Sequence, residues 1–388
     1  MLFLLSCSFK QDIKPLQKAT YHIIDLDGKR EKRIHLSSIF KKEVKTIILE
    51  TVENCLISDI SNLQVFEDHF YILDAIQAMA LLVFDRDGRF VRKIGNLGRG
   101  PGEYSDISDF TIDAENKHIY ILDRLRVHKY HITGAYINTI EIKSIRVSAN
   151  FIQYYGGKLY SDAYGYSANN GGYLLQEIDP ENGKITAKFL ELSYNKGWNE
   201  TFFTGHSFFM NRLGTPRYSQ LFTDTIVSLS GGVTPFIALK SNDLVTAKDI
   251  ERLNSLKNEE IYPYARFNTL RKTTRIFDVN NYIELANAVI FDYRHGNAVK
   301  TVWYDIQTQK TRITDYLHND LVYKDESITN IRHFSNGRGV YEVIDGIYFP
   351  DFLEIIKKGG LSPGLDKREE LMRLTEDSNP VIFYYEAK

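Results

Sequence analysis

The chain has 388 residues, a formal net charge of −2 and 13% aromatic residues, with 25 tyrosines and 23 phenylalanines against four methionines. A near-neutral charge excludes the broad basic surface that nucleic-acid binding normally requires, so we expect no nucleic-acid partner. No window of the sequence approaches the roughly 18 apolar residues of a membrane-spanning helix, and two cysteines cannot build a disulfide framework. The aromatic surplus favours β-strands, because aromatic side chains suit a pleated, half-buried surface.

The first residues predict export and anchoring. Leu4-Leu5-Ser6-Cys7 resembles a bacterial lipobox, in which a small residue precedes the cysteine that receives lipid, and the chain turns polar at Lys10. We therefore expect residues 1–19 to be a lipobox-like export remnant and tether, with Cys7 as the lipidation site. The apolar stretch before Cys7 is shorter than the roughly 7–15 residues of a signal's hydrophobic region. The alternative is an apolar terminus that holds an incidental cysteine.

From about residue 20 onward, the chain repeats one strand pattern. Tyr71-Ile72-Leu73-Asp74 is matched 49 residues later by Tyr120-Ile121-Leu122-Asp123, and each copy is followed by a turn with a glycine, Gly88 or Gly134. Alternating residues place side chains on opposite faces of a strand, and Asp87-Gly88 supplies a tight hairpin turn. A period of this length is close to one blade of a β-propeller, in which a four-stranded sheet is the repeating unit.

Weaker copies continue along the chain. They begin at Leu159, Thr225, Val302 and Val340, and Ile24–Gly28 resembles a turn of the same kind before the first copy. The sixth copy pairs the strand that begins at Val340 with a second strand at Gly346–Phe349. We therefore predict an all-β fold, a six-bladed β-propeller with short helical insertions, formed by residues 20–388.

Two segments interrupt the strand pattern. Asp243–Glu260 is charged and spaces its apolar residues closer to a helical period than to a strand period, and Pro363–Glu376 is typical of a second short helix. We expect both to be insertions on the rim. Val381–Tyr385 is a strong terminal strand, and pairing one terminus with a blade begun by the other would remove the open edges of the ring.

Residues 71–113 carry a family resemblance. They contain Phe84-Asp85-Arg86-Asp87-Gly88, the heptapeptide Gly98-Arg99-Gly100-Pro101-Gly102-Glu103-Tyr104, and Asp109-Phe110-Thr111-Ile112-Asp113. This region resembles the bacterial six-bladed β-propeller lipoproteins related to NHL-repeat proteins, and the heptapeptide is the most specific part. The resemblance implies the propeller fold, export, and a lipoprotein of the outer membrane in the cell envelope, facing the periplasm or the surface. It implies no defined chemistry, because members of that family are largely without an assigned activity.

The heptapeptide invites comparison with a phosphate-binding loop. Such a loop needs Gly-Lys-Ser/Thr at the start of a helix, and Pro101 removes a backbone donor. We expect a structural loop between blades, with Arg99 and Glu103 available for an ion pair and Gly100 in a backbone conformation that only glycine reaches without steric cost. The alternative is a ligand-facing loop at the channel mouth, with Arg99, Glu103 and Tyr104 as binding residues.

Local motifs of catalysis and metal binding do not occur in the sequence: it contains no His-Glu-x-x-His, Cys-x-x-Cys or Gly-x-Ser-x-Gly. We therefore predict no catalytic residue, no metal site and no cofactor. Asp74 and Asp123 recur at equivalent places in the repeat, which favours a role in capping a strand over a catalytic one.

These observations favour a binding protein whose partner is a glycan, a peptide or a protein, bound at the loop face or in the central channel. Contact with a membrane would be through the lipid anchor only. The alternative is a propeller lyase or hydrolase with an acidic, possibly metal-assisted site in the channel.

Overall fold

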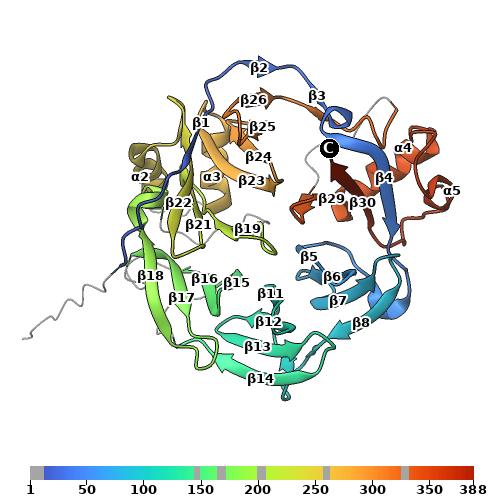
Figure 1. Ribbon diagram of the computed structural model, residues 1–388, viewed down its shortest axis with the longest axis horizontal. Coiled ribbons are helices and arrows are strands. Elements are labelled where there is room, and N and C mark those ends of the chain that lie inside the picture. Colours follow the sequence, from blue (N-terminus) through green and yellow to red (C-terminus); the bar gives the residue numbers. More distant parts are fainter. Residues whose placement is uncertain (1–12, 144–148, 164–171, 199–206, 257–262, 325–331) are drawn as a thin grey trace, which may run out of the picture.

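The computed structural model describes residues 13–143, 149–163, 172–198, 207–256, 263–324 and 332–388. Six sheets stand as blades around a central axis (Figure 1). The predicted six-bladed β-propeller is therefore confirmed. Cys7 lies outside the described residues.

In blades 1 to 3 the strands follow one another in the chain from the axis outward, and neighbours are antiparallel. Blade 1 consists of β5 (Asn62–Phe66), β6 (His69–Asp74), β7 (Ala80–Asp85) and β8 (Phe90–Ile94). Blade 2 consists of β11 (Asp109–Asp113), β12 (His118–Asp123), β13 (Arg126–His131) and β14 (Tyr136–Glu141). Blade 3 consists of β15 (Ile152–Tyr155), β16 (Lys158–Asp162), β17 (Tyr173–Ile178) and β18 (Ile185–Glu191).

Blades 4 and 5 have the same order, and each gains a fifth, outermost strand from the start of the chain. Blade 4 consists of β19 (Phe209–Met210), β20 (Arg217–Tyr218), β21 (Thr225–Ser228) and β22 (Thr234–Lys240), with β1 (His22–Asp25) parallel to β22. Blade 5 consists of β23 (Ile276–Glu284), β24 (Ala288–His295), β25 (Ala298–Asp305) and β26 (Thr311–Thr314), with β2 (Arg30–Glu31) parallel to β26.

Residues 14–35 form a belt around the outside of three blades (Figure 1). Lys14 forms a parallel bridge with Phe189 of blade 3, β1 and β2 cover blades 4 and 5, and β3 (Ile34–His35) pairs in parallel with β27 (Leu317–His318). The belt covers strand edges that would otherwise expose unpaired backbone groups. The turn expected at Ile24–Gly28 is present at Leu26–Gly28. It is not a hairpin turn of the repeat, because it follows the edge strand β1 and leads to β2 on the next blade.

Blade 6 closes the ring with strands from both ends of the chain. It consists of β28 (Arg332–Ser335), β29 (Gly339–Ile344), β30 (Val381–Ala387) and the outermost strand β4 (Phe40–Ile48). Ile48 lies opposite Val381 in an antiparallel pair. The terminal strand and its closing role agree with the sequence prediction.

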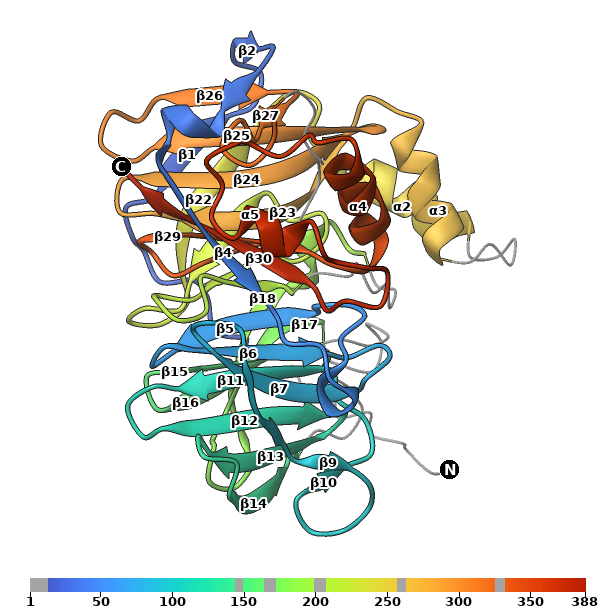
Figure 2. The same cartoon turned by 90° about the vertical axis from the view of Figure 1, so that its right-hand side faces the viewer.

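Both segments that were predicted to be helical insertions contain a helix, and the described residues form two further helices that were not predicted. The helices are α2 (Ala247–Ser255), α3 (Pro263–Arg271), α4 (Phe349–Lys357) and α5 (Arg368–Leu371), with short 3-10 turns at Leu36–Ser38, Glu53–Cys55, Leu192–Asn195 and Gly346–Tyr348. Figure 2 shows α2, α3 and α4 on one face of the ring. Thr246 caps α2 through a capping box with Asp249.

The prediction of a strand at Gly346–Phe349 is wrong. This segment is a 3-10 turn that leads into α4, which has Pro350 in its first turn and buries Phe352 and Ile356. Proline is favoured at the start of a helix, and a spacing of four residues places both side chains on one helical face. The next strand of the blade after β29 is β30, which follows the helices and pairs with β29.

A turn glycine joins neighbouring blades. The Gly88 carbonyl accepts the Glu50 N–H (2.8 Å), and the Gly183 carbonyl accepts the Lys143 N–H (2.9 Å). At both glycines φ is positive, and a β-carbon would lie 2.3 Å from the Ile48 carbonyl oxygen at Gly88 and 1.8 Å from that of Glu141 at Gly183. At Gly88 and Gly183, glycine is therefore required by the close approach of two backbones as well as by the turn. At Gly134 the nearest atom to a β-carbon, on the Ile94 side chain, would be 3.4 Å away, so there the turn alone (φ +95°) requires glycine.

Candidate functional site

The repeated aspartates cap strands on blade after blade. The Asp74 carboxylate accepts the backbone N–H groups of Ser58, Ile76 and Gln77 at 2.9–3.0 Å. The Asp123 carboxylate accepts the N–H of Ser105 (2.9 Å). These carboxylates are buried and are used to hold the loops that precede or follow their strands.

Asp162 is the third member of this series and is the least satisfied. One of its carboxylate oxygens accepts the N–H groups of Asn150 (2.9 Å) and Phe151 (2.7 Å), while the other finds no hydrogen-bond partner within the described part of the chain. Burial, with the nearby charge of Asp109 as a smaller cause, raises the pKa of Asp162 to about 7. The surroundings of Asp162 thus favour its neutral form.

The heptapeptide forms a loop between blades 1 and 2. Its ends are β9 (Asn96–Leu97) and β10 (Glu103–Tyr104), which pair in parallel. Arg99 is exposed, and neither Arg99 nor Glu103 makes an ion pair among the described residues, so the expected ion pair is not formed. The Glu103 carboxylate instead accepts the Gly100 N–H (2.8 Å). Tyr104 is fully buried.

The strained glycine of this loop is Gly102 rather than Gly100. The φ of Gly102 is +75°, and its carbonyl accepts the hydroxyl of Tyr130 in blade 2 (2.7 Å). The loop is thereby fixed against the next blade. Arg99, Glu103 and Tyr104 do not line the channel pocket described below, and their part in ligand binding stays a prediction.

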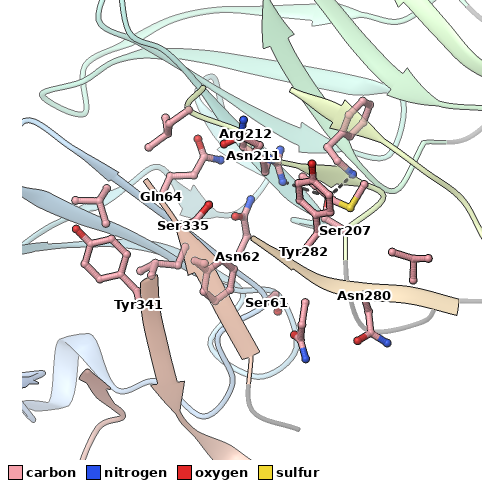
Figure 3. A pocket seen from close by; sticks show the side chains of 18 residues that line it. Ser61, Asn62, Gln64, Ser207, Asn211, Arg212, Asn280, Tyr282, Ser335 and Tyr341 are labelled. Atoms are coloured by element: carbon pink, nitrogen blue, oxygen red, sulfur yellow. Dashed lines mark hydrogen bonds between the residues drawn. The ribbon is translucent and has the colours of Figure 1, made fainter. Parts of the chain in front are cut away.

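A pocket of about 100 Å³ lies in the central channel between strands of blades 1, 4, 5 and 6. Its volume holds several water molecules or a ligand of comparable size. Amide and hydroxyl side chains are frequent in its lining, alongside apolar and aromatic ones (Figure 3). The polar lining residues are Ser61, Asn62, Gln64, Ser207, Asn211, Arg212, Asn280, Asn281, Tyr282, Ser335 and Tyr341.

Arg212 is the one cation among these lining residues, and its charge is neutralised within the protein. Both terminal nitrogens donate to the two carboxylate oxygens of Asp109 (2.9 Å each), and Nε donates to Gln153 (3.0 Å). Asp109 also accepts the side-chain N–H of Asn62 (2.7 Å). A two-pronged arginine–carboxylate pair is strong and directional. This network joins blades 1, 2, 3 and 4 at the axis.

A second arginine–carboxylate pair stands beside the channel. Arg217 of β20 donates to both oxygens of Glu284 at the end of β23 (2.7 and 2.8 Å), and Glu284 also accepts the hydroxyl of Tyr282 (2.8 Å). Both oxygens of the Glu284 carboxylate are therefore engaged by protein donors. The lining contains no Asp, Glu, His or Cys among the described residues.

One buried polar atom of the pocket remains without a partner within the described residues. Gln64 is only 2% exposed; its side-chain N–H donates to the Phe110 carbonyl (3.0 Å), but its Oε1 accepts no hydrogen bond within the described residues. The hydroxyl of Ser335 likewise makes no hydrogen bond there. Figure 3 shows Asn62, Gln64 and Ser335 around one space. A buried acceptor without a donor is costly, so it marks a place that a ligand or water fills.

Sequence reasoning did not find this site. Gln64 and Ser335 lie in ordinary strand positions, and Arg212 lies in a short segment that follows the repeat poorly. One signal was present: Arg212 stands among Phe208, Phe209 and Leu213, and a cation in an apolar stretch often has a buried partner.

No group of three or more His, Cys, Asp or Glu side chains able to hold a metal ion occurs in the ranges that the structure describes. Within the same ranges, no helix has the length and apolar character needed to span a membrane.

Comparison with known proteins finds solved structures of similar fold. The structure is similar to that of a Bacteroides fragilis NCTC 9343 protein described as exported, with a TM-score of 0.70, 18% identity, and coverage of 94% of this chain and 99% of the other. It is also similar to a member of the duf4221 family from Bacteroides vulgatus, with a TM-score of 0.51, 10% identity, and coverage of 90% and 99%. No curated protein matches the sequence. The match to the family described as "Domain of unknown function (DUF4934)" spans residues 21–386, and the chain therefore belongs to that family.

Proposed function

We propose that the protein is an exported, lipid-anchored propeller that binds an uncharged, hydroxyl-rich ligand, such as the end of a glycan chain, in its channel pocket. The observation that carries this proposal is the buried Oε1 of Gln64, an acceptor without a donor in a preformed pocket. Amides both donate and accept hydrogen bonds, as hydroxyl groups do, so an amide-lined pocket suits a ligand rich in hydroxyls. Asp109 neutralises Arg212, the one cation among the described lining residues, so these residues offer no free charge to an ionic ligand.

The alternative of a lyase or hydrolase has no observation in its favour. General acid–base chemistry needs an ionisable group within reach of the substrate. The carboxylates that bond to polar residues of the pocket, Asp109 and Glu284, are each engaged by an arginine. A binding pocket is the simpler account of this geometry.

Replacing Gln64 by methionine should separate binding from stability. The Phe110 carbonyl keeps the donors of Asn62 (3.2 Å) and Arg212 (2.8 Å), and the unpartnered oxygen is removed, so the variant should melt at or above the wild-type temperature. Binding of a neutral oligosaccharide should weaken by about two- to tenfold, the value of one neutral hydrogen bond. Ser335→Ala should do the same. Calorimetric titration with a panel of neutral, anionic and cationic sugars measures this.

Gln307→Met is the matched control, since Gln307 is exposed in a turn of blade 5, and it should bind like the wild type. If no neutral sugar binds, or if Gln64→Met binds as tightly as the control, the proposed ligand is wrong. Binding of an uncharged peptide in place of a sugar, with the same loss in Gln64→Met, would keep the site and replace the ligand class.

Export and anchoring rest on Leu4-Leu5-Ser6-Cys7 and on the exported protein of similar structure. In the organism from which the gene comes, we expect the wild type in the membrane fraction and Cys7→Ala in the soluble fraction. Intact-mass measurement should show acyl chains on the wild type alone. A wild type that is soluble, or one that carries no acyl chain, would refute the anchor without affecting the channel site.

A further inference from the structure

A second and larger hollow lies away from the channel, between blade 6 and blade 1. Its volume is about 790 Å³. Its lining comes from four places in the chain: the segment 51–58, the end of β6, the start of α4, and residues 376–380. We call this hollow the inter-blade groove. It is far larger than the channel pocket. Its lining includes the start of α4, which lies on the same face of the ring as α2 and α3 (Figure 2).

The rim of the inter-blade groove is acidic. Glu53, Glu376 and Asp377 line it, are exposed, and form no ion pair among the described residues, and the lining contains no lysine or arginine. The protein as a whole is close to neutral, so this is a local excess of negative charge. These carboxylates do not form a cluster able to hold a metal ion, as far as the chain is described.

Apolar side chains are exposed at the same place. Val52 is 41% exposed and Leu56 is 50% exposed, and both line the groove together with the exposed Pro350. Large apolar side chains that share one hollow with a polar rim are typical of interaction sites. The occupant should therefore offer apolar side chains as well as positive charge.

The groove is held open by internal hydrogen bonds. The Asn379 side chain accepts the Ile57 N–H (2.8 Å) and donates to the carbonyls of Glu50 (2.6 Å) and Cys55 (2.8 Å), and the Thr51 hydroxyl accepts the Asn379 N–H (2.9 Å). The two segments that carry the acidic rim are thereby fixed to one another. A preformed site loses less conformational entropy on binding.

We propose that the inter-blade groove binds a segment of a partner protein that carries lysine or arginine side chains alternating with apolar ones. The acidic rim attracts the basic side chains, and Val52 and Leu56 contact the apolar ones. This site is independent of the channel pocket, with which it shares no lining residue. Complementary charge speeds association and selects the partner, while the apolar contacts slow dissociation.

The test uses the full protein and a fluorescent peptide of lysine, leucine and serine in a repeating order, with glutamate in place of lysine as the comparison peptide. We expect saturable binding of the lysine peptide, measured by anisotropy, that weakens as salt is raised. The combined change Glu53→Gln, Glu376→Gln and Asp377→Asn should weaken binding roughly tenfold and flatten the salt dependence. Leu56→Ser should weaken binding without changing the salt dependence.

The matched control is Glu43→Gln, Glu115→Gln and Glu251→Gln, which removes three exposed carboxylates elsewhere and changes the net charge equally. This variant should bind like the wild type. The proposal is overturned if the lysine peptide does not bind, if the glutamate peptide binds equally, or if both triple variants lose binding to the same extent. Gln64→Met should leave peptide binding unchanged, so the two sites are tested separately.

Discussion

Arg212→Met is expected to lower the free energy of unfolding by about 3 kcal/mol or more, the range for removing one partner of a buried ion pair. The Arg212 side chain is 8% exposed and that of Asp109 is 2% exposed. Methionine keeps the apolar stem but leaves the Asp109 carboxylate with only the donors of Asn62 and Ile152. The carbonyls of Phe110 and Ile152 also lose a donor. Denaturant unfolding followed by fluorescence measures the change.

The control is Arg124→Met, which makes the same substitution in an exposed pair. Arg124 is 74% exposed and its Nε lies 3.4 Å from the carboxylate of Asp106, so the loss should stay below about 1 kcal/mol. Adding Asp109→Asn to Arg212→Met should recover part of the stability, because the unpaired charge is gone. Equal effects at Arg212 and Arg124 would contradict a central role for the axial network.

Gly183→Ala is expected to destabilise the protein by about 3 kcal/mol, from a strained backbone of about 1–3 kcal/mol together with a steric clash between blades. At Gly183 φ is +71°, and the new β-carbon would lie 1.8 Å from the Glu141 carbonyl oxygen. Neither backbone can retreat without breaking the hydrogen bond from Lys143 to the Gly183 carbonyl. Thermal and denaturant unfolding should both report the loss.

Gly156 provides the comparison. Its φ is +58°, but nothing lies within 4 Å of the position that a β-carbon would take. Gly156→Ala should therefore cost only the backbone strain, about 1 kcal/mol. If Gly183→Ala and Gly156→Ala lower the free energy of unfolding equally, the close contact between blades 2 and 3 at Gly183 adds nothing to the cost of the strained turn.

The blades were predictable because their signals are local. The strand patterns around Tyr71 and Tyr120 and the glycines of the turns lie within one repeat, where periodicity and turn chemistry act. The helix α4 was missed because Tyr348 and Phe349 look like strand residues, although Pro350 and the spacing of Phe352 and Ile356 indicate a helix.

The candidate site could not be predicted in the same way. Arg212 bonds to Asp109, which is 103 positions earlier in the chain, and the lining of the pocket comes from four blades. Nothing in the neighbourhood of Gln64 indicates that its oxygen faces a cavity. The heptapeptide, in contrast, is prominent in the sequence, but it forms a loop between blades 1 and 2 that does not line the channel pocket.

The belt and β4 have a consequence for the order of folding. The partners of the belt begin at residue 188, and Ile48 must wait for Val381, roughly 330 residues later. At a synthesis rate of about 5–20 residues per second, β4 remains unpaired for roughly 20–70 s. Blades 1 to 3 can form during that time, because each consists of four strands that are consecutive in the chain. Ring closure must therefore be the last event, and until it happens the nascent protein presents free strand edges that are prone to aggregation.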